Sequence, residues 1–227
     1  MRLARDGWKV AVHYSSDEAG AQETSRLLAI AASGVYRADL EHPKAAEELL
    51  EAAWADGALQ AVINNAGIYI PLTFATASDE QFEENLRRTF AINFESPLRI
   101  ARAAVRHFGD EDGGKILNVA SRVGFKSEAG ACLYAASKAA LINLTRSLAV
   151  ELAPNHIGVF GIAPGWVDTA MARAGVVTRI AEILPTIPLN RMASPEDCAA
   201  ATAFLLSDEA AYLSGEVIDI NGASYFH

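Results

Sequence analysis

Short apolar runs alternate with longer stretches of helical pattern along most of the 227 residues. The apolar runs predict strands at residues 8–14, 34–39, 59–64, 115–121, 157–163 and 216–220. Helices are predicted at residues 17–32, 43–56, 79–108 and 132–153 and from residue 194 onward, with a break near Pro97 and a less regular segment at 164–193. Strands that alternate with helices pair in parallel. The pattern therefore predicts an α/β fold, a doubly wound parallel sheet in one domain that spans residues 1–227.

Composition narrows the classes of partner. The formal net charge of -9 argues against a nucleic-acid partner. No apolar run approaches the roughly 20 residues of a membrane helix, and the first residues lack a secretory pattern. The two cysteines, Cys132 and Cys198, form no Cys-x-x-Cys pair, and the five histidines lack the spacing of a metal site. These features predict a cytoplasmic protein with free thiols, no metal and no membrane contact.

A serine, a tyrosine and a lysine carry the clearest chemical signal. Tyr134 and Lys138 are four residues apart in a predicted helix, so their side chains share one face. A phenol titrates near ~10, and a neighbouring ammonium favours its anion. Ser121 ends a predicted strand, where open α/β sheets place their ligands. These three side chains are suited to transferring a proton to or from an oxygen whose carbon gains or loses a hydride. The alternative is that they have no joint role and are an ordinary strand-end serine, a half-buried tyrosine and a surface lysine.

Four further motifs, taken with this one, resemble the short-chain dehydrogenase/reductase family, and most closely its 3-oxoacyl-(acyl-carrier-protein) reductase branch. They are Asn64-Asn-Ala-Gly67, Asn93 within Phe90-Ala-Ile-Asn-Phe94, Pro164-Gly-Trp-Val-Asp-Thr169 and Gly215-Glu-Val-Ile-Asp-Ile-Asn-Gly222. They occur in the family's order, and the likeness covers essentially all 227 residues. The resemblance implies a Rossmann-like fold and an NAD(P)-dependent oxidoreductase.

The resemblance assigns catalytic roles to four residues. Tyr134 would be the general acid in reduction, and Lys138 would lower the pKa of that phenol and hold the nicotinamide ribose. Ser121 would orient the substrate carbonyl. Asn93 would hold a water that links Lys138 to solvent; without the family likeness, Asn93 is better explained as a helix asparagine bonded to backbone.

The resemblance also places the cofactor. Asp39 would contact the adenine, and the backbone at Asn65, Ala66 and Gly67 would pass under the adenosine ribose. Another segment would contact the nicotinamide carboxamide and a phosphate, and its residues are Pro164, Gly165, Val167 and Thr169.

The end of the second family strand favours NADP over NAD. An acidic residue there would bind the ribose 2′-hydroxyl of NAD and repel a 2′-phosphate. This chain has Tyr14-Ser15-Ser16 at that place, with no carboxylate until Asp17 and no arginine. Ser15 would hydrogen-bond the phosphate without repelling it.

The family's opening strand and its turn, Thr-Gly-x-x-x-Gly-x-Gly, are not found. The sequence begins Met1-Arg-Leu-Ala-Arg-Asp-Gly7, which resembles the end of the first helix, and Gly7, Gly20 and Gly34 are isolated. The expectation is an N-terminally incomplete chain; the alternative is a natural variant that dispenses with the turn. Because the absent strand lies at the centre of the family sheet, we expect a gap between two half-sheets with exposed edges.

The substrate is less constrained. The resemblance implies a carbonyl or secondary alcohol, with a 3-oxoacyl thioester as one candidate, and a homotetramer or homodimer. Four bases could form a basic rim around the site that would suit an acidic acyl carrier or a coenzyme A thioester: Arg122, Lys126, Arg173 and Arg179. The alternative is that they are scattered, solvated surface residues. The alternative function is a non-catalytic interaction subunit that keeps the fold. The intact set Ser121, Asn93, Tyr134 and Lys138 argues against that alternative.

Overall fold

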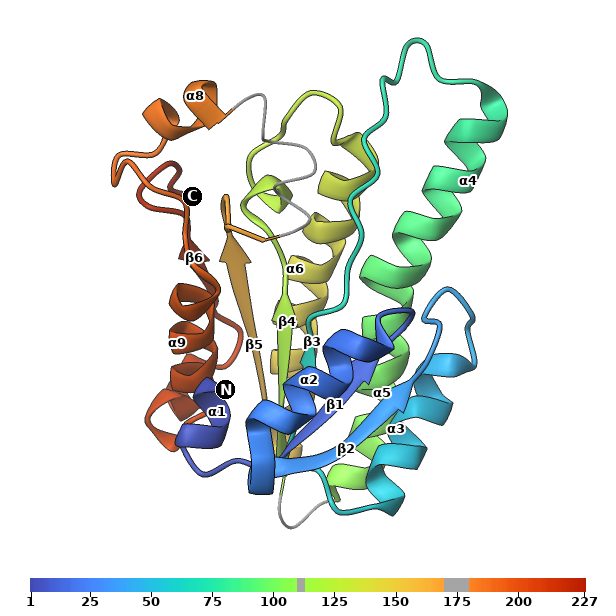
Figure 1. The fold of residues 1–227 in the computed structure, drawn as a ribbon, viewed down its shortest axis with the longest axis vertical. Coiled ribbons are helices and arrows are strands. Elements are labelled where there is room, and N and C mark those ends of the chain that lie inside the picture. The colour runs from blue at the N-terminus through green and yellow to red at the C-terminus, as the bar shows by residue number, and fades with distance from the viewer. Residues whose placement is uncertain (110–112, 170–179) are drawn as a thin grey trace.

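The computed structural model describes residues 1–109, 113–169 and 180–227, in which strands and helices alternate as predicted (Figure 1). Every strand pairing is parallel. The strands are β1 (Val10–Tyr14), β2 (Ala32–Arg37), β3 (Ala61–Asn64), β4 (Gly114–Val119), β5 (Ile157–Pro164) and β6 (Val217–Ile220).

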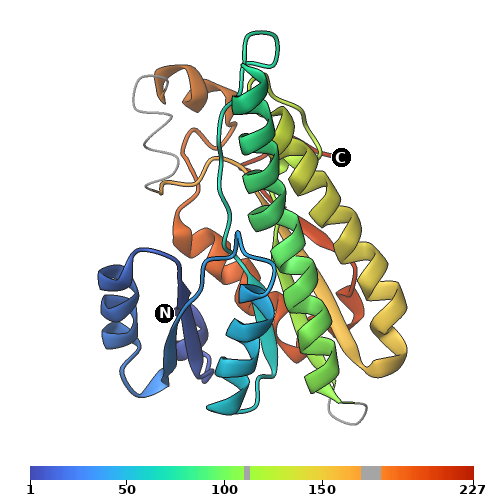
Figure 2. The same ribbon diagram turned by 90° about the vertical axis from the view of Figure 1, so that its right-hand side faces the viewer.

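The helices cover both faces of the sheet, so the predicted doubly wound α/β class is confirmed (Figure 2). They are α1 (Arg2–Arg5), α2 (Glu18–Leu28), α3 (Ala45–Ala55), α4 (Asp79–Phe90), α5 (Ser96–Phe108), α6 (Cys132–Leu152), α8 (Ile180–Ile183) and α9 (Pro195–Leu205). Short 3-10 turns occupy Ala29–Ala31, Arg122–Gly124, Ala153–Asn155, Leu184–Thr186 and Asp208–Leu213.

Local polar side chains explain where several helices begin. The carboxylate of Asp17 accepts a hydrogen bond from the Gly20 N–H at the start of α2. Ser78 before α4 and Ser194 before α9 each form a capping box with the residue three positions later. These bonds satisfy backbone N–H groups that the first helical turn leaves without partners.

The chain departs from the predicted boundaries between α2 and β2. The helix predicted at 17–32 ends at Leu28, because Ala29 adopts a positive φ of 51° that an α-helix does not permit. Strand β2 therefore begins at Ala32 and ends at Arg37, two residues earlier than predicted at each end. Asp39 consequently lies in the loop after β2 rather than in the strand.

The sheet is in two pieces. Strands β1 and β2 pair only with each other, and the remaining strands form a four-stranded sheet in the order β3-β4-β5-β6. Within the described residues, no pairing joins β1 to β3, so the predicted gap between two half-sheets is confirmed. Helix α3 connects the halves by packing on α5: Trp54 stacks on His107 with ring centroids 4.6 Å apart.

Two apolar layers enclose the central strands β4 and β5. On one face Ile116 and Val159 join the cluster that α3, α5 and α6 contribute, and on the other Leu117 and Phe160 pack against α9. These four side chains are at most 1% exposed. Burial on both faces explains why the two strands are continuous apolar runs in the sequence.

The long helical stretch at 79–108 is interrupted by a π turn, Ala91–Glu95, between α4 and α5. The prediction placed a break at Pro97, which instead lies in the first turn of α5, where a missing N–H is tolerated. The interruption is centred on Asn93, which is fully buried. The irregular turn thus coincides with a predicted site residue, as π turns often do.

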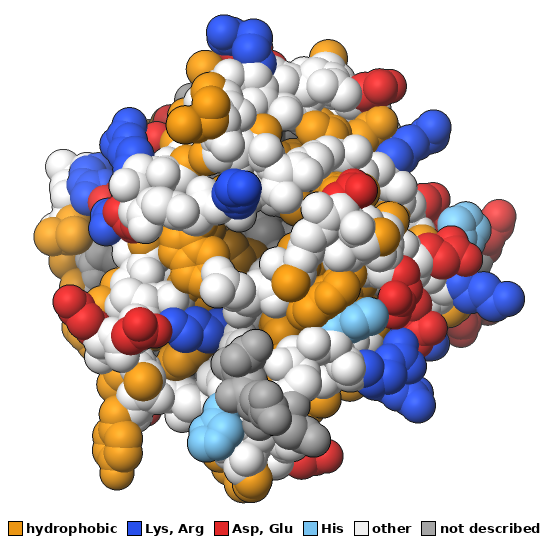
Figure 3. All heavy atoms as spheres, turned by 90° about the horizontal axis from the view of Figure 1, so that it is seen from below, with side chains coloured by type: hydrophobic (Ala, Val, Ile, Leu, Met, Phe, Trp, Pro, Cys, Tyr) orange, Lys and Arg blue, Asp and Glu red, His pale blue; other side chains and the backbone are white. Residues whose placement is uncertain are grey.

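The molecular surface carries mixed charge. On the face where the strands begin, acidic and basic side chains are interspersed around exposed hydrophobic side chains (Figure 3). No helix in the described part of the chain is long and apolar enough to cross a membrane.

Candidate active site

The sequence motifs converge at one edge of the four-stranded sheet. Because β3, β4 and β5 are parallel, their carboxyl ends lie together, at the upper edge of the sheet in Figure 1. The segments that follow these ends contain Asn65–Gly67, Ser121 and Gly165–Thr169. Open α/β sheets bind ligands at such an edge.

Helix α6 brings Tyr134 and Lys138 to Ser121. It begins at Cys132, so Tyr134 lies in its first turn and Lys138 one turn later. The Ser121 hydroxyl donates a hydrogen bond of 3.5 Å to the Pro164 carbonyl oxygen, and it is near enough to the Tyr134 phenol to lower the pKa of that phenol. The Lys138 Nζ is 5.7 Å from the centroid of the Tyr134 ring. The three residues predicted to act together therefore form one cluster.

Lys138 is an almost fully buried base, with 3% of its surface exposed. Its Nζ donates a hydrogen bond of 2.7 Å to the carbonyl oxygen of Val119, the last residue of β4. Burial lowers the pKa of Lys138 to about 8. Among the described residues no carboxylate forms an ion pair with it, so two of its three N–H donors remain for a ligand.

The direction of the Tyr134 pKa differs from the expectation. Burial raises the pKa of the phenol, the hydrogen bond from Ser121 lowers it in part, and the nearby Tyr69 raises it further. Lys138 points its ammonium at the Val119 carbonyl, and the cost of burying a phenolate dominates. The phenol is therefore held protonated at neutral pH, which is the form a proton donor needs.

Asn93 is held by protein groups on every side. Its Oδ1 accepts from the Ile68 N–H at 2.9 Å, and its Nδ2 donates to the Ile68 carbonyl at 3.0 Å and to the Ser137 hydroxyl at 3.1 Å. The side chain thus matches the alternative interpretation, an asparagine bonded to backbone. Its effect is to fasten the segment after β3 to the side of α6 that carries Tyr134 and Lys138.

Gly67 shows why that segment needs a small residue. A Cβ at this position would lie 3.3 Å from the Asn93 Oδ1 and 3.4 Å from the Lys138 Nζ. Two residues on, the Tyr69 ring packs against the Tyr134 ring in a T-shaped arrangement, with centroids 5.2 Å apart. The sequence did not identify Tyr69, and the only available signal was its place two residues after the Asn-Asn-Ala-Gly motif.

The other predicted nicotinamide-side residues line the same edge. Pro164 ends β5, and a Cβ on Gly165 would lie 3.1 Å from the Cβ of Asn221. Val167 forms a parallel bridge with Ala193, which holds this segment beside the start of α9. Thr169 is exposed and is the last described residue before position 180.

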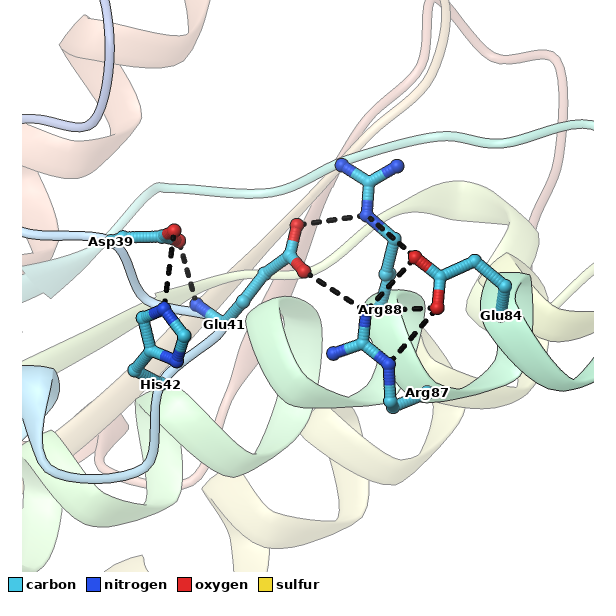
Figure 4. A network of polar contacts seen from close by, with 6 residues as sticks. All are labelled: Asp39, Glu41, His42, Glu84, Arg87 and Arg88. Atoms are coloured by element: carbon cyan, nitrogen blue, oxygen red, sulfur yellow. Dashed lines mark hydrogen bonds and ion pairs between the residues drawn. The ribbon is translucent and has the colours of Figure 1, made fainter.

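The predicted adenine-side residues lie on the other half-sheet. Ser15 follows β1 and is exposed, and the Asp39 carboxylate accepts from the Glu41 N–H at 3.1 Å. An ion-pair network ties this loop to α4 (Figure 4). Glu41 pairs with Arg88 at 2.8 Å and with Arg87 at 3.3 Å, so the Asp39 loop is anchored to the helix that leads to Asn93.

The predicted basic rim is not formed as expected. Arg122 is 5% exposed and pairs with Glu128, so its charge is compensated inside the protein. Lys126 is exposed, with its Nζ 6.0 Å from the Tyr225 ring centroid, and Arg173 and Arg179 lie outside the described residues. The described part of the chain also holds no group of three or more metal-ligating side chains.

Comparison with known proteins agrees with this geometry. Residues 1–223 match the family model described as Enoyl-(Acyl carrier protein) reductase. The chain is 35% identical over 224 residues to the 3-oxoacyl-[acyl-carrier-protein] reductase FabG of Escherichia coli, covering 98% of this chain and 89% of that protein. It is also 35% identical over 186 residues to an acetoacetyl-CoA reductase of Acinetobacter, covering 82% of this chain and 73% of the relative.

A solved structure shares the fold. The blue fluorescent protein from a metagenomic library, crystallised with NADPH, superposes with a TM-score of 0.90 at 29% identity, covering 99% of this chain and 91% of that one. The family model spans nearly the whole chain, and the motifs that follow β3, β4 and β5 meet at one edge of the sheet. The chain belongs to the short-chain dehydrogenase/reductase family.

Proposed function

We propose that the protein is an NADP-dependent oxidoreductase that transfers a hydride between nicotinamide and a carbonyl or secondary alcohol. The observation that carries this proposal is the cluster of Ser121, Tyr134 and Lys138 at the carboxyl edge of the sheet. A hydroxyl that can orient a carbonyl, a protonated phenol and a buried base are the groups that such a reaction requires.

The residues at this edge fit a dinucleotide. Lys138 is a buried base with unused donors, and Gly67 beside it leaves the space that a Cβ would fill. Lys138 would hold the nicotinamide ribose, and the backbone of Asn65, Ala66 and Gly67 would pass under the adenosine ribose. Pro164, Gly165, Val167 and Thr169 would contact the nicotinamide carboxamide, with Asp39 at the adenine. When bound, NADPH supplies the hydride.

In reduction the protein's own groups act on the carbonyl oxygen. The Ser121 hydroxyl donates a hydrogen bond that orients it, and the Tyr134 hydroxyl transfers its proton to it as the carbon becomes an alcohol. The Lys138 ammonium lies close enough to stabilise the phenolate that remains. In oxidation the same phenolate takes the proton back.

The substrate class that the relatives favour is a 3-oxoacyl thioester. Two relatives are named as a 3-oxoacyl-[acyl-carrier-protein] reductase and an acetoacetyl-CoA reductase. Of the predicted rim bases that the structure describes, Lys126 is exposed and Arg122 is paired with Glu128. The proposal therefore depends on the relatives and the carbonyl chemistry more than on surface charge.

Titration with NADPH should raise the melting temperature of the protein in a concentration-dependent way. A ligand that binds only the folded state at 100 times its Kd adds about 2.7 kcal/mol, which is roughly 5–10 °C for a chain of this size. Acetoacetyl-CoA should then oxidise NADPH, followed as loss of absorbance at the nicotinamide band. A protein that melts at the same temperature with and without NADPH would contradict the proposed function and favour the interaction subunit.

We also propose that residues 1–227 form one domain that assembles as a homotetramer or homodimer in the cytoplasm. Exposed hydrophobic side chains support an interface on the long helices and the C-terminal segment: Leu98 on α5, Val150 on α6 and Phe226. Light scattering after size exclusion should give a mass two or four times 24.2 kDa. A single species at the monomer mass would contradict this assembly.

A further inference from the structure

In a dinucleotide-binding sheet, the adenosine ribose binds at the carboxyl end of the strand that corresponds to β1. Tyr14 ends the strand and Ser15 follows it, so two hydroxyl-bearing residues occupy this place. The nearest acid, Asp17, caps α2 through its bond to the Gly20 N–H and is occupied there. No carboxylate lies between Tyr14 and Ser16, and the Asp17 carboxylate, which keeps its charge, is directed at the N-terminus of α2.

An arginine lies opposite this turn on the neighbouring strand. In the parallel register of β1 and β2, Arg37 is the partner of Tyr14, and the Ala38 N–H donates to the Tyr14 carbonyl at 3.0 Å. Neighbouring strands are about 4.8 Å apart, and paired residues project from the same face. The backbone of Arg37 is therefore adjacent to the Tyr14-Ser15 turn.

The charge of Arg37 has no partner in the described part of the chain. Arg37 is exposed, and within residues 1–109, 113–169 and 180–227 it forms no ion pair or hydrogen bond. Many other arginines of this acidic chain do pair with carboxylates, for example Arg2, Arg26, Arg87, Arg88 and Arg191. A guanidinium without a partner among the described residues, next to the Tyr14-Ser15-Ser16 hydroxyls, is suited to a phosphate, which it can bind with two parallel N–H donors.

We propose that Arg37 binds the adenosine 2′-phosphate of NADP together with Ser15, and that this contact makes the protein prefer NADP to NAD. The inference rests on the proposed function, because it needs a dinucleotide across the same edge of the sheet. It names a residue that local sequence could not identify: Arg37 is 22 positions from Ser15 in the chain, and the β1–β2 pairing brings the two strands together.

The direct test uses adenosine 2′,5′-bisphosphate and 5′-AMP, which carry the adenine with and without the 2′-phosphate and no nicotinamide. Isothermal titration of the full chain should show that Arg37→Gln weakens the bisphosphate roughly 10- to 100-fold and leaves 5′-AMP unchanged. Arg37→Lys should recover part of the loss, because an ammonium retains the charge but not the planar fork. Arg5→Gln removes another exposed arginine that has no ion pair among the described residues; it is the matched control and should bind both probes like the parent.

The same variants separate this inference from the proposed function. With acetoacetyl-CoA, Arg37→Gln should lose the preference for NADPH over NADH. If Arg37→Gln keeps the full preference, or weakens both probes equally, Arg37 does not bind the 2′-phosphate and the proposed function stands. A parent protein that binds neither probe nor NADPH would overturn both.

Discussion

Replacing Tyr134 by phenylalanine should lower kcat roughly 100- to 10,000-fold, the usual range for loss of a general acid. The variant keeps the ring that packs edge-on against Tyr69 and loses only the hydroxyl whose pKa Ser121 lowers. The melting temperature should therefore stay within a few degrees of the parent. The measurement is NADPH oxidation at saturating acetoacetyl-CoA, together with a thermal melt of the same samples.

A matched change elsewhere makes this result specific. Tyr212 is fully exposed, so Tyr212→Phe removes a phenol hydroxyl without touching the site. It should turn over at the parent rate. Near-parental activity in Tyr134→Phe would show that this phenol does not transfer the proton, and an equal loss in both variants would point to a preparation artefact rather than to chemistry.

The sheet and its functional edge could be predicted because they depend on local patterns. Runs such as the one containing Ile116 and Leu117 are apolar at every position, since they are buried on both faces. The gap between β1 and β3 could also be predicted, because the family order places an absent strand between them. Short motifs at strand ends then indicated which residues meet at the edge.

Interactions between distant side chains could not be predicted in this way. Glu41 meets Arg88 across 47 residues of sequence, and only the folded loop shows that the pair anchors Asp39. Arg122 was predicted as a cation of the basic rim, but in the structure it is buried and paired with Glu128. The two Asn93 bonds to Ile68 likewise depend on the π turn, which no local propensity marks.

The pKa of Tyr134 shows the same limit in electrostatic terms. Spacing places Lys138 one helical turn away and predicts a lowered phenol pKa. The structure adds burial, which acts in the opposite direction, and directs the ammonium at the Val119 carbonyl. Proximity along a helix is visible in a sequence, but desolvation depends on everything packed around the group.

Replacing Lys138 by methionine should abolish turnover and at the same time stabilise the fold. Burial lowers the pKa of Lys138 from 10.5 to about 8, and at 1.36 kcal/mol per unit the buried charge costs the folded state about 3 kcal/mol at neutral pH. Methionine fills similar volume without that cost but forfeits the hydrogen bond to Val119, worth about 1.5–3 kcal/mol for a charged donor. The net expectation is about +1 kcal/mol, or roughly +2–4 °C in Tm at pH 7.

The pH dependence of this difference identifies its cause. Because the folded pKa of about 8 lies below the unfolded value of 10.5, the unfolded chain binds more protons between those pH values. The stability of the parent therefore gains a contribution that grows as pH rises through this window, and Lys138→Met lacks it. Other groups titrate equally in both proteins and cancel in the comparison. The stability advantage of Lys138→Met over the parent should therefore shrink as the pH rises from 7 to 10. Urea unfolding at each pH measures the unfolding free energy of both proteins. A difference that stays constant across that range would show that burial does not penalise the Lys138 charge and that this base is not held ready for a ligand.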